Sequence, residues 1–282
     1  MGRIEEKFDE LKEKKEKALI AFISAGDPDI DTTKSLVLEM ERRGADIIEL
    51  GVPFSDPLAD GPTIQKSYLR ALKGKTSLKK IIKMVKELRG RICVPIVLMS
   101  SYNPVLRYGE DRFVNDAVIS GIDGVIIPDL PPEESDNLCK IANQKGLDTI
   151  FLLAPTSDEE RMKLICGRNC GFIYYISVTG ITGARKSMSG DIGRMVKKIK
   201  RFTDLPVAVG FGVSTPEQAE NIAKHSDGII VGSAIVKIIE KSGQNKKRLV
   251  KDVGDFIGEL KSAISFHRKD RGECRENILI SL

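Results

Sequence analysis

Residues 46–62 read DIIELGVPFSDPLADGP, and this stretch joins a short apolar run to a loop rich in proline and glycine. A continuous apolar run is typical of a strand that is buried on both faces of a parallel sheet. Glu49 interrupts the run near its C-terminal end, and Asp56 and Asp60 follow in the loop. Because a buried carboxylate is normally paired or used, two interpretations of Glu49 stand: a functional acid, or a side chain that leaves the core or forms a salt bridge.

The strand-then-helix pattern of this stretch repeats along the chain. Apolar runs predict eight strands, at residues 18–25, 46–50, 95–99, 124–127, 148–153, 171–177, 206–210 and 227–231. Helical spacing predicts helices at 3–16, at 31–43 with Asp31 or Thr32 as the N-cap, and at 63–72, 77–88, 110–120, 133–145, 158–167, 190–201, 215–224, 233–241 and 246–264.

Strands that alternate with helical crossovers run parallel, and eight such units in a chain of this length predict an α/β fold of the (β/α)8 TIM-barrel type, with an extra N-terminal helix and additional short helices. A doubly wound open sheet is the alternative, but no Gly-x-Gly-x-x-Gly turn follows the first strand. We expect a single barrel domain over residues 1–265, and a polar extension over 266–282 that is mobile by default.

The composition argues against a nucleic-acid-binding protein and against a membrane protein. The 282 residues carry a net charge of only +5, and the charges fall mostly on helical faces. The chain shows neither a signal-peptide core nor a run long enough to span a bilayer, which predicts an intracellular, cytoplasmic location. Five cysteines without Cys-x-x-Cys spacing, and only two histidines, argue against a zinc site. Cys93 and Cys139 follow apolar patterns and are predicted to be buried.

In a barrel of this kind the active site lies at the C-terminal ends of the strands. Glu49 lies late in its strand, so the functional interpretation now takes precedence, and Asp60 on the next loop can reach the same mouth. Two carboxylates from one strand-loop unit can divide proton transfer between them. Apolar and aromatic walls are expected from different strands: Phe22, Leu98, Ile127, Leu153, Tyr174 and Phe211.

Glycines mark the loops after the last three strands. They occur at Gly180 and Gly183, at Gly210 and Gly212, and at Gly232 before Ser233. Glycine lets backbone N–H groups approach an anion closely, and a helix N-terminus adds a favourable dipole. The loops after strands seven and eight commonly bind phosphate in this fold. Without a P-loop in the chain, these glycines predict a phosphorylated metabolite rather than a nucleoside triphosphate.

The run from Glu49 to Gln65, ELGVPFSDPLADGPTIQ, closely resembles the signature of the tryptophan synthase alpha subunit family. Shorter matches follow in the expected order and cover nearly everything except the tail: AGDP at 25–28, PDLP at 128–131, TG at 182–183, GFGV at 210–213 and VGSA at 231–234. The resemblance implies a carbon–carbon lyase of tryptophan biosynthesis, which cleaves indole-3-glycerol phosphate to indole and glyceraldehyde 3-phosphate.

The resemblance also implies residue roles. Glu49 would be the general acid/base, and Asp60 would bind the indole N–H and stabilise its positive charge. Gly183, Gly212, Gly232 and Ser233 would bind the phosphate, and Thr182 with Gly183 would belong to a lid over the site. Tyr174 matches the tyrosine of the sixth strand, although Tyr175 beside it leaves that assignment open by one residue. The reaction needs no metal, cofactor or Schiff-base lysine, because the protonated indole is the electron sink.

The resemblance further implies a partner, a pyridoxal-phosphate beta subunit that receives the indole in an alpha2beta2 heterotetramer. Asp56, Pro57 and Asp129 lie on segments similar to the partner-facing loops of the family, while helix capping and turn formation remain equal alternatives for each. Two other functions stay open: a regulatory subunit that binds a phosphorylated metabolite and activates its partner, and another phosphosugar barrel enzyme such as an isomerase or epimerase.

Overall fold

The computed structural model describes residues 2–177, 185–210, 212–243 and 245–265, and of residues 185–190 it describes the helical backbone alone. The predicted tail at 266–282 therefore lies outside the described residues, as do Thr182, Gly183 and Phe211.

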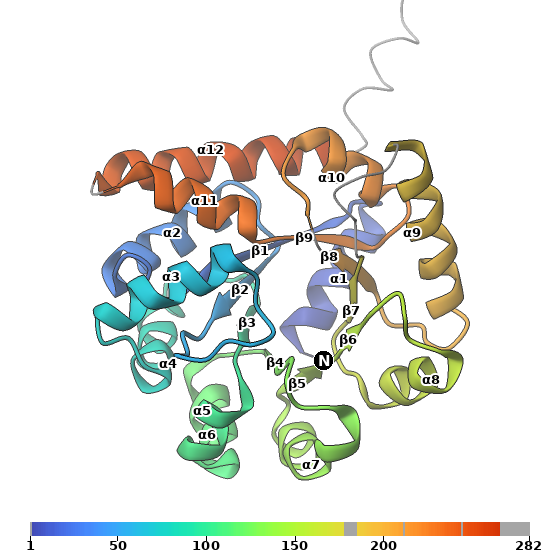
Figure 1. Cartoon of the computed structure of the whole chain (residues 1–282), viewed down its shortest axis with the longest axis horizontal. Helices are drawn as coiled ribbons and strands as arrows, with labels where there is room; N and C mark the ends of the chain where they lie inside the picture. Colours follow the sequence, from blue (N-terminus) through green and yellow to red (C-terminus); the bar gives the residue numbers. More distant parts are fainter. Residues whose placement is uncertain (1, 178–184, 211, 244, 266–282) are drawn as a thin grey trace, which may run out of the picture.

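Parallel strands form a nearly closed barrel in which every strand pairs with its neighbours in parallel (Figure 1). The strands are β1 (Ala18–Ser24), β2 (Ile47–Gly51), β3 (Ile96–Met99), β4 (Gly124–Ile126), β5 (Asp148–Ile150), β6 (Leu152–Leu153), β7 (Ile173–Ile176), β8 (Val207–Gly210) and β9 (Gly228–Val231). The predicted (β/α)8 barrel is confirmed.

The fifth predicted strand, at 148–153, is divided into β5 and β6. β5 pairs with β4, whereas β6 pairs with β7, and only Phe151 separates the two. The Phe151 N–H donates to the side-chain oxygen of Asn169 instead of to a strand. The strand changes partners at this residue, so the nine strand segments of the described residues make eight barrel positions.

Helices surround the barrel on its outside, and one further helix lies at its axis (Figure 1). The helices are α1 (Arg3–Glu13), α2 (Ile30–Arg42), α3 (Pro62–Lys73), α4 (Leu78–Leu88), α5 (Tyr102–Tyr108), α6 (Glu110–Ser120), the 3-10 turn η1 (Pro132–Glu134), α7 (Asp136–Lys145), α8 (Glu159–Arg168), α9 (Arg185–Ile199), α10 (Pro216–Ala223), α11 (Ser233–Ser242) and α12 (Lys246–Ile264). The predicted N-cap of α2 was wrong, because Asp29 accepts from the Thr32 N–H and Asp31 already lies within the helix.

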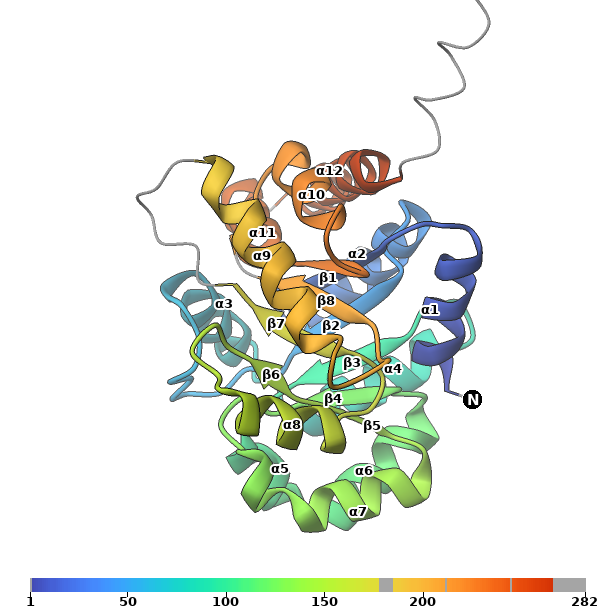
Figure 2. The ribbon, with the colours of Figure 1, turned by 90° about the vertical axis from the view of Figure 1, so that its right-hand side faces the viewer.

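Among the described residues, one large apolar core lies inside the strands and another between the strands and the outer helices, and a small third cluster joins Phe22 to α3 and α11. The inner core joins Ile20, Ile47, Val97 and Ala208 to α1, whose Ile4, Phe8 and Leu11 are buried against it. The rings of Phe8 and Phe172 lie 5.7 Å apart. α1 thus closes the N-terminal end of the barrel, opposite the end where α3 begins (Figure 2), so the interior of the barrel opens toward its C-terminal end.

The side chains of a buried strand alternate between the two cores, and this alternation corrects several sequence predictions. Leu98, Ile127 and Leu153 pack in the outer core, so the predicted walls at these positions were wrong. Their neighbours Met99, Ile126 and Leu152 face inward instead. The predicted burial of Cys93 and Cys139 was also wrong: Cys93 is exposed and Cys139 only half-buried. Among the helices that the structure describes, none is long and apolar enough to cross a membrane.

Candidate active site

Glu49 faces the inside of the barrel near the C-terminal end of β2. Its backbone lies level with Phe22 on β1 and Val97 on β3, and it follows the inward residue Ile47 by two positions. The side chain is 1% exposed, and neither carboxyl oxygen has a hydrogen-bond partner among the described residues. Burial and the nearby Asp60 raise the pKa of Glu49 to about 8. At neutral pH the carboxyl is therefore predominantly protonated, and it can give up a proton.

Asp60 lies on the loop between β2 and α3, two residues before that helix begins. The Asp60 N–H donates to the Pro57 carbonyl, and the Gln65 side chain donates to the Asp60 carbonyl, so the backbone is held at both sides. Partial burial and the nearby Asp129 raise the pKa of Asp60 to about 6. Asp60 is thus predominantly ionised at pH 7, where Glu49 is predominantly neutral.

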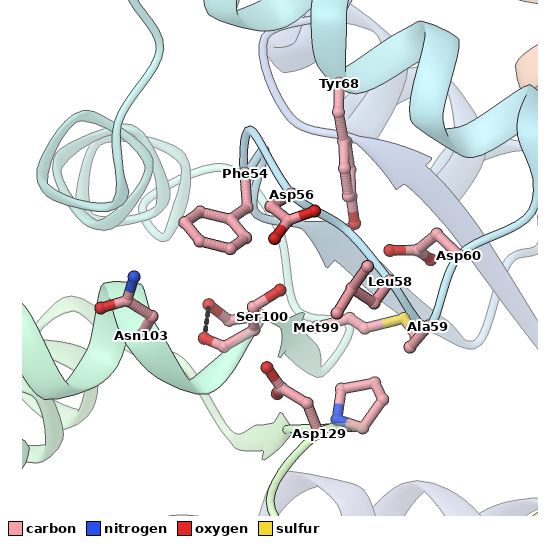
Figure 3. Close-up of a pocket in the computed structure, with 12 residues that line it drawn as sticks. Phe54, Asp56, Leu58, Ala59, Asp60, Tyr68, Met99, Ser100, Asn103 and Asp129 are labelled. Atoms are coloured by element: carbon pink, nitrogen blue, oxygen red, sulfur yellow. Dashed lines mark hydrogen bonds between the residues drawn. The ribbon is translucent and has the colours of Figure 1, made fainter.

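A cavity of about 280 Å³ opens between this loop and the ends of β3 and β4 (Figure 3). Its lining combines aromatic and apolar side chains with three carboxylates: Phe54, Asp56, Leu58, Ala59, Asp60, Tyr68, Met99, Ser100, Ser101, Asn103, Pro128 and Asp129. The described lining contains no lysine or arginine. Because the lining offers carboxylates and no cation, the cavity suits a neutral, flat group with an N–H donor better than it suits an anion.

Three inward-facing glycines at the C-terminal ends of β2, β8 and β9 leave space for aromatic rings. A Cβ on Gly51 would lie 2.6 Å from Cζ of Phe22, and one on Gly210 would lie 2.9 Å from Oη of Tyr174. A Cβ on Gly232 would meet Cδ1 of Phe22 at 3.2 Å. Side chains along β7 alternate between the inner and the outer core, and this alternation shows which of the two adjacent tyrosines faces inward. Tyr174 packs toward the inner core, and Tyr175 is buried in the outer core.

The predicted phosphate-binding residues lie at the ends of β8 and β9. Gly232 is the N-cap of α11 and Ser233 its exposed first residue, so the first N–H groups of that helix have no partner within it. Gly212 lies two residues past β8, the strand paired with β9, and has a positive φ of 74°. A helix N-terminus beside a glycine-rich turn is a favourable anion site.

Comparison with known proteins gives the chain its family. The family model described as tryptophan synthase alpha chain matches residues 8–265. A tryptophan synthase alpha chain from Geotalea daltonii is 52% identical over 266 residues, covering 94% of this chain and 100% of the relative. The chain belongs to the tryptophan synthase alpha chain family. The predicted lyase of tryptophan biosynthesis is thereby confirmed.

Further relatives agree in sequence and in structure. An alpha chain from a Thermoanaerobacter species is 48% identical over 264 residues, covering 94% of this chain and 100% of the relative. The crystal structure of tryptophan synthase subunit alpha from Legionella pneumophila superposes with a TM-score of 0.87 at 37% identity, covering 94% of this chain and 98% of that one. The family's barrel and this chain's barrel therefore coincide over almost their full lengths.

The residues predicted to face the partner of a tryptophan synthase alpha chain lie on the rim of the cavity. Asp56 and Asp129 both line it, and Pro57 lies between Asp56 and the exposed Leu58. Asp129 also accepts a hydrogen bond from the Tyr102 N–H at the start of α5, so the alternative role of helix capping applies to it. Asp129 can cap α5 and still face a partner, because the Tyr102 N–H uses only its Oδ1.

Sequence analysis missed Tyr68, which reaches the cavity from α3. Its position one helical turn after Ile64 is the ordinary signature of a core residue, and the sequence carries nothing else to single it out. Phe54 and Ser100 were missed for a related reason, since loop side chains turn toward or away from a cavity without any periodic pattern.

Proposed function

We propose that the chain carries out its family's reaction, the cleavage of indole-3-glycerol phosphate to indole and glyceraldehyde 3-phosphate, through Glu49 and Asp60. One observation carries the assignment of roles. Glu49 is an inward, fully buried carboxyl without a partner among the described residues, on the strand that leads directly into the loop of Asp60. Stability alone does not favour an unpaired buried carboxyl, whereas proton transfer requires one.

The protonation states match the sequence of steps. With its pKa near 8, Glu49 starts neutral and donates its proton to the ring carbon C3 of the substrate. With its pKa near 6, Asp60 starts ionised and accepts a hydrogen bond from the indole N–H, which becomes more acidic as the ring becomes cationic. Glu49, now a carboxylate, removes the proton of the side-chain hydroxyl.

Carbon–carbon bond cleavage then completes the balance. As the hydroxyl proton passes to Glu49, the oxygen forms the aldehyde of glyceraldehyde 3-phosphate, and the electrons of the broken bond return to the indole ring. Glu49 ends protonated, as it began, and no external acid, base or oxidant is consumed. The aromatic-lined interior beside Phe22 and Tyr174 suits the indole ring.

The other end of the substrate is a phosphate, and we assign it to the turn at Gly212 and the N-terminus of α11 at Gly232 and Ser233. β8 and β9 are neighbours in the sheet, so these residues extend from adjacent strand ends. Gly183, with Thr182, is assigned by sequence alone, since both lie outside the described residues. In the sheet only β1 separates β2, which carries Glu49, from β9, so the two proposed ends of the substrate belong to neighbouring strand ends of the same barrel mouth.

A tryptophan synthase beta subunit is the partner that we propose for the rim. Leu58 is 86% exposed and lies beside Asp56 and Pro57 on the loop that carries Asp60. An exposed leucine flanked by acidic residues is suited to a protein interface. A partner that contacts Leu58 would act directly on the position of Asp60, because Leu58 and Asp60 belong to the same loop between β2 and α3.

The deciding experiment compares the purified chain with its Glu49→Gln variant on indole-3-glycerol phosphate, with and without a beta subunit. Glutamine keeps the shape of glutamate but cannot transfer the proton, so we expect indole release to fall about a thousand-fold while the Kd for the substrate changes only a few-fold. Glu259→Gln, at an exposed position of α12, is the control and keeps full activity. Full turnover by Glu49→Gln would refute the acid/base role, and wild-type protein that binds the substrate without cleaving it would favour the regulatory alternative.

A further inference from the structure

α3 and α11 lie side by side, and each follows a strand that carries part of the proposed site (Figure 1). α3 begins two residues after Asp60, and the Gln65 side chain in its first turn donates to the Asp60 carbonyl. α11 begins at Ser233, and the Val236 N–H in its first turn donates to the Gly232 carbonyl. The spacing between these two helices therefore determines how far Asp60 lies from the proposed phosphate site.

The guanidinium of Arg70, on α3, joins both helices to the strand between them. β1 lies between β2 and β9 in the sheet, and Asp27 lies three residues past the end of β1. Nε and Nη2 of Arg70 donate to the two carboxyl oxygens of Asp27, each at 2.8 Å. Nη1 of Arg70 donates to Glu240 of α11 at 3.2 Å. Arg70 thus connects three segments that follow three neighbouring strands.

The contact between Arg70 and Asp27 is enclosed on the side of the carboxylate. The Asp27 side chain is 0% exposed, and that of Arg70 is 29% exposed. Burial raises the pKa of Asp27, and the contact with Arg70 opposes that rise. Two parallel hydrogen bonds fix the plane of the guanidinium as well as its distance. Because burying both charges costs desolvation energy, such a pair adds little net stability, and its main contribution here is geometric.

Other contacts among α3, α11 and β1 leave their spacing less sharply defined. Ile64 of α3, Val236 of α11 and Phe22 of β1 belong to one apolar cluster. The Ser67 and Ser24 hydroxyls are hydrogen-bonded at 2.5 Å, which joins α3 to β1 but not to α11. Apolar packing is non-directional, whereas a bidentate ion pair specifies both a distance and an angle.

Arg70 acts on the site only through the segments that it joins. It is not among the described residues that line the cavity. The contacts of its guanidinium within the described part of the chain are those to Asp27 and Glu240. A change at Arg70 therefore reaches a substrate through the placement of α3 and α11.

We propose that Arg70 is a positioning residue, which sets the distance between Asp60 and the proposed phosphate-binding N-terminus of α11 by joining α3 and α11 to Asp27. The proposal rests on the function proposed above. A substrate with an indole at one end and a phosphate at the other must reach both groups at once, so a change in their separation weakens productive binding of the whole molecule. A ligand that carries only one of these ends is insensitive to that separation.

The test is Arg70→Lys, which keeps a positive charge beside Asp27 but cannot form the bidentate contact and reach Glu240 as well. We expect kcat/KM for indole-3-glycerol phosphate to fall about ten-fold, because the two ends of the site are no longer held at the productive distance. Indole and glycerol 3-phosphate each probe one end, and we expect their inhibition constants to change less than about two-fold.

Arg43→Lys is the matched control. Arg43 also bridges two helices, since it follows the last residue of α2, contacts Glu39 of that helix at 2.8 Å and contacts Asp255 of α12 at 2.7 Å. Its side chain is 31% exposed and lies outside the described cavity lining. We expect kcat/KM and both inhibition constants of this variant to stay within about two-fold of wild type.

A purely structural role for Arg70 gives a different result. If Arg70→Lys lowers the thermal midpoint but leaves kcat/KM unchanged, or weakens the substrate and both one-ended ligands equally, the positioning role is overturned and the lyase function stands. Glu240→Ala, which removes only the contact with α11, replaces Arg70→Lys should that variant not fold by circular dichroism. Its kcat/KM is expected to fall about three-fold, and an unchanged value overturns the proposal. Wild-type protein without lyase activity refutes the proposed function itself.

Discussion

At the scale of single residues, environment gives Glu49 and Asp60 different tasks. Both are carboxyls from one strand-loop unit, and burial raises the pKa of each. Glu49 is fully enclosed and also faces the charge of Asp60, so its pKa reaches about 8, whereas that of Asp60, partly open to the cavity, reaches about 6. One acid is thus kept neutral and the other ionised at the same pH, which a proton donor and an electrostatic stabiliser require.

These values predict a bell-shaped dependence of kcat/KM on pH. Activity declines below about pH 6, because Asp60 gains a proton and loses the charge that stabilises the cationic ring, and it declines above about pH 8, because Glu49 loses the proton that it must donate. Indole release between pH 5 and pH 10 measures both limbs.

Asp60→Asn serves as the internal control for this profile. It removes the negative charge that helps to raise the pKa of Glu49, so the alkaline limb of its residual activity moves to lower pH. A wild-type rate that stays constant from pH 5 to pH 10 would contradict both assignments.

The sequence predicted the two catalytic candidates but not the side chains around them. Glu49 and Asp60 differ from their surroundings in charge, and a charge within an apolar strand is visible without a structure. Leu98, Ile127 and Leu153 were assigned inward although Met99, Ile126 and Leu152 face inward. In a strand that is apolar on both faces, sequence alternation does not reveal which residue faces which side.

At the scale of elements, the N-terminus of α11 is the feature on which the proposed phosphate binding depends. Ser233→Asp places a negative charge in the first turn of α11, where the charge interacts favourably with the helix dipole but repels a phosphate. We expect KM for indole-3-glycerol phosphate to rise at least about ten-fold, while the thermal midpoint does not fall. Steady-state kinetics and a thermal melt separate the two effects.

The control makes the same change at another helix. Ser77 is the N-cap of α4 and accepts a hydrogen bond from the Lys80 N–H. Ser77→Asp adds the same charge outside the described cavity lining, so KM stays within about two-fold of wild type. Equal kinetic effects of the two variants would remove α11 from the phosphate site.

Most elements were predictable because local chemistry marks their ends. Pro62 at the first position of α3 and glycine in the left-handed conformation at the end of α6 and α7 are such marks. The division between β5 and β6 was not predictable, since it depends on a hydrogen bond between Phe151 and Asn169 that comes from distant sequence. The N-cap of α2 was misplaced because Asp29, Asp31 and Thr32 all have side chains that can cap a helix, and the fold selects Asp29.

At the scale of the whole molecule, the two ends of the barrel differ. α1 closes the N-terminal end with apolar side chains, and the C-terminal end carries the cavity and the acidic rim. We therefore expect the proposed partner to bind on the rim, where Leu58 is a large, exposed apolar side chain.

Leu58→Asp tests this interface. Loss of a leucine that the proposed interface would bury, together with insertion of a charge, is expected to weaken binding of a beta subunit at least about ten-fold, measured by calorimetry. Ile119→Asp is the matched control, since Ile119 is 70% exposed on α6, outside the described cavity lining, and its replacement leaves binding unchanged. If the two variants bind the partner equally well, the interface lies elsewhere.

The three inward glycines have a consequence for engineering the specificity of this enzyme. Gly51, Gly210 and Gly232 face Phe22, Tyr68 and Tyr174 so closely that no added carbon fits without moving a ring. Larger residues at these three positions would fill the interior of the barrel beside the aromatic rings and leave less room for a substrate. Room for bulkier ring-substituted indoles must come from trimming the opposing aromatic side chains, which makes those positions the natural targets for evolving new substrates.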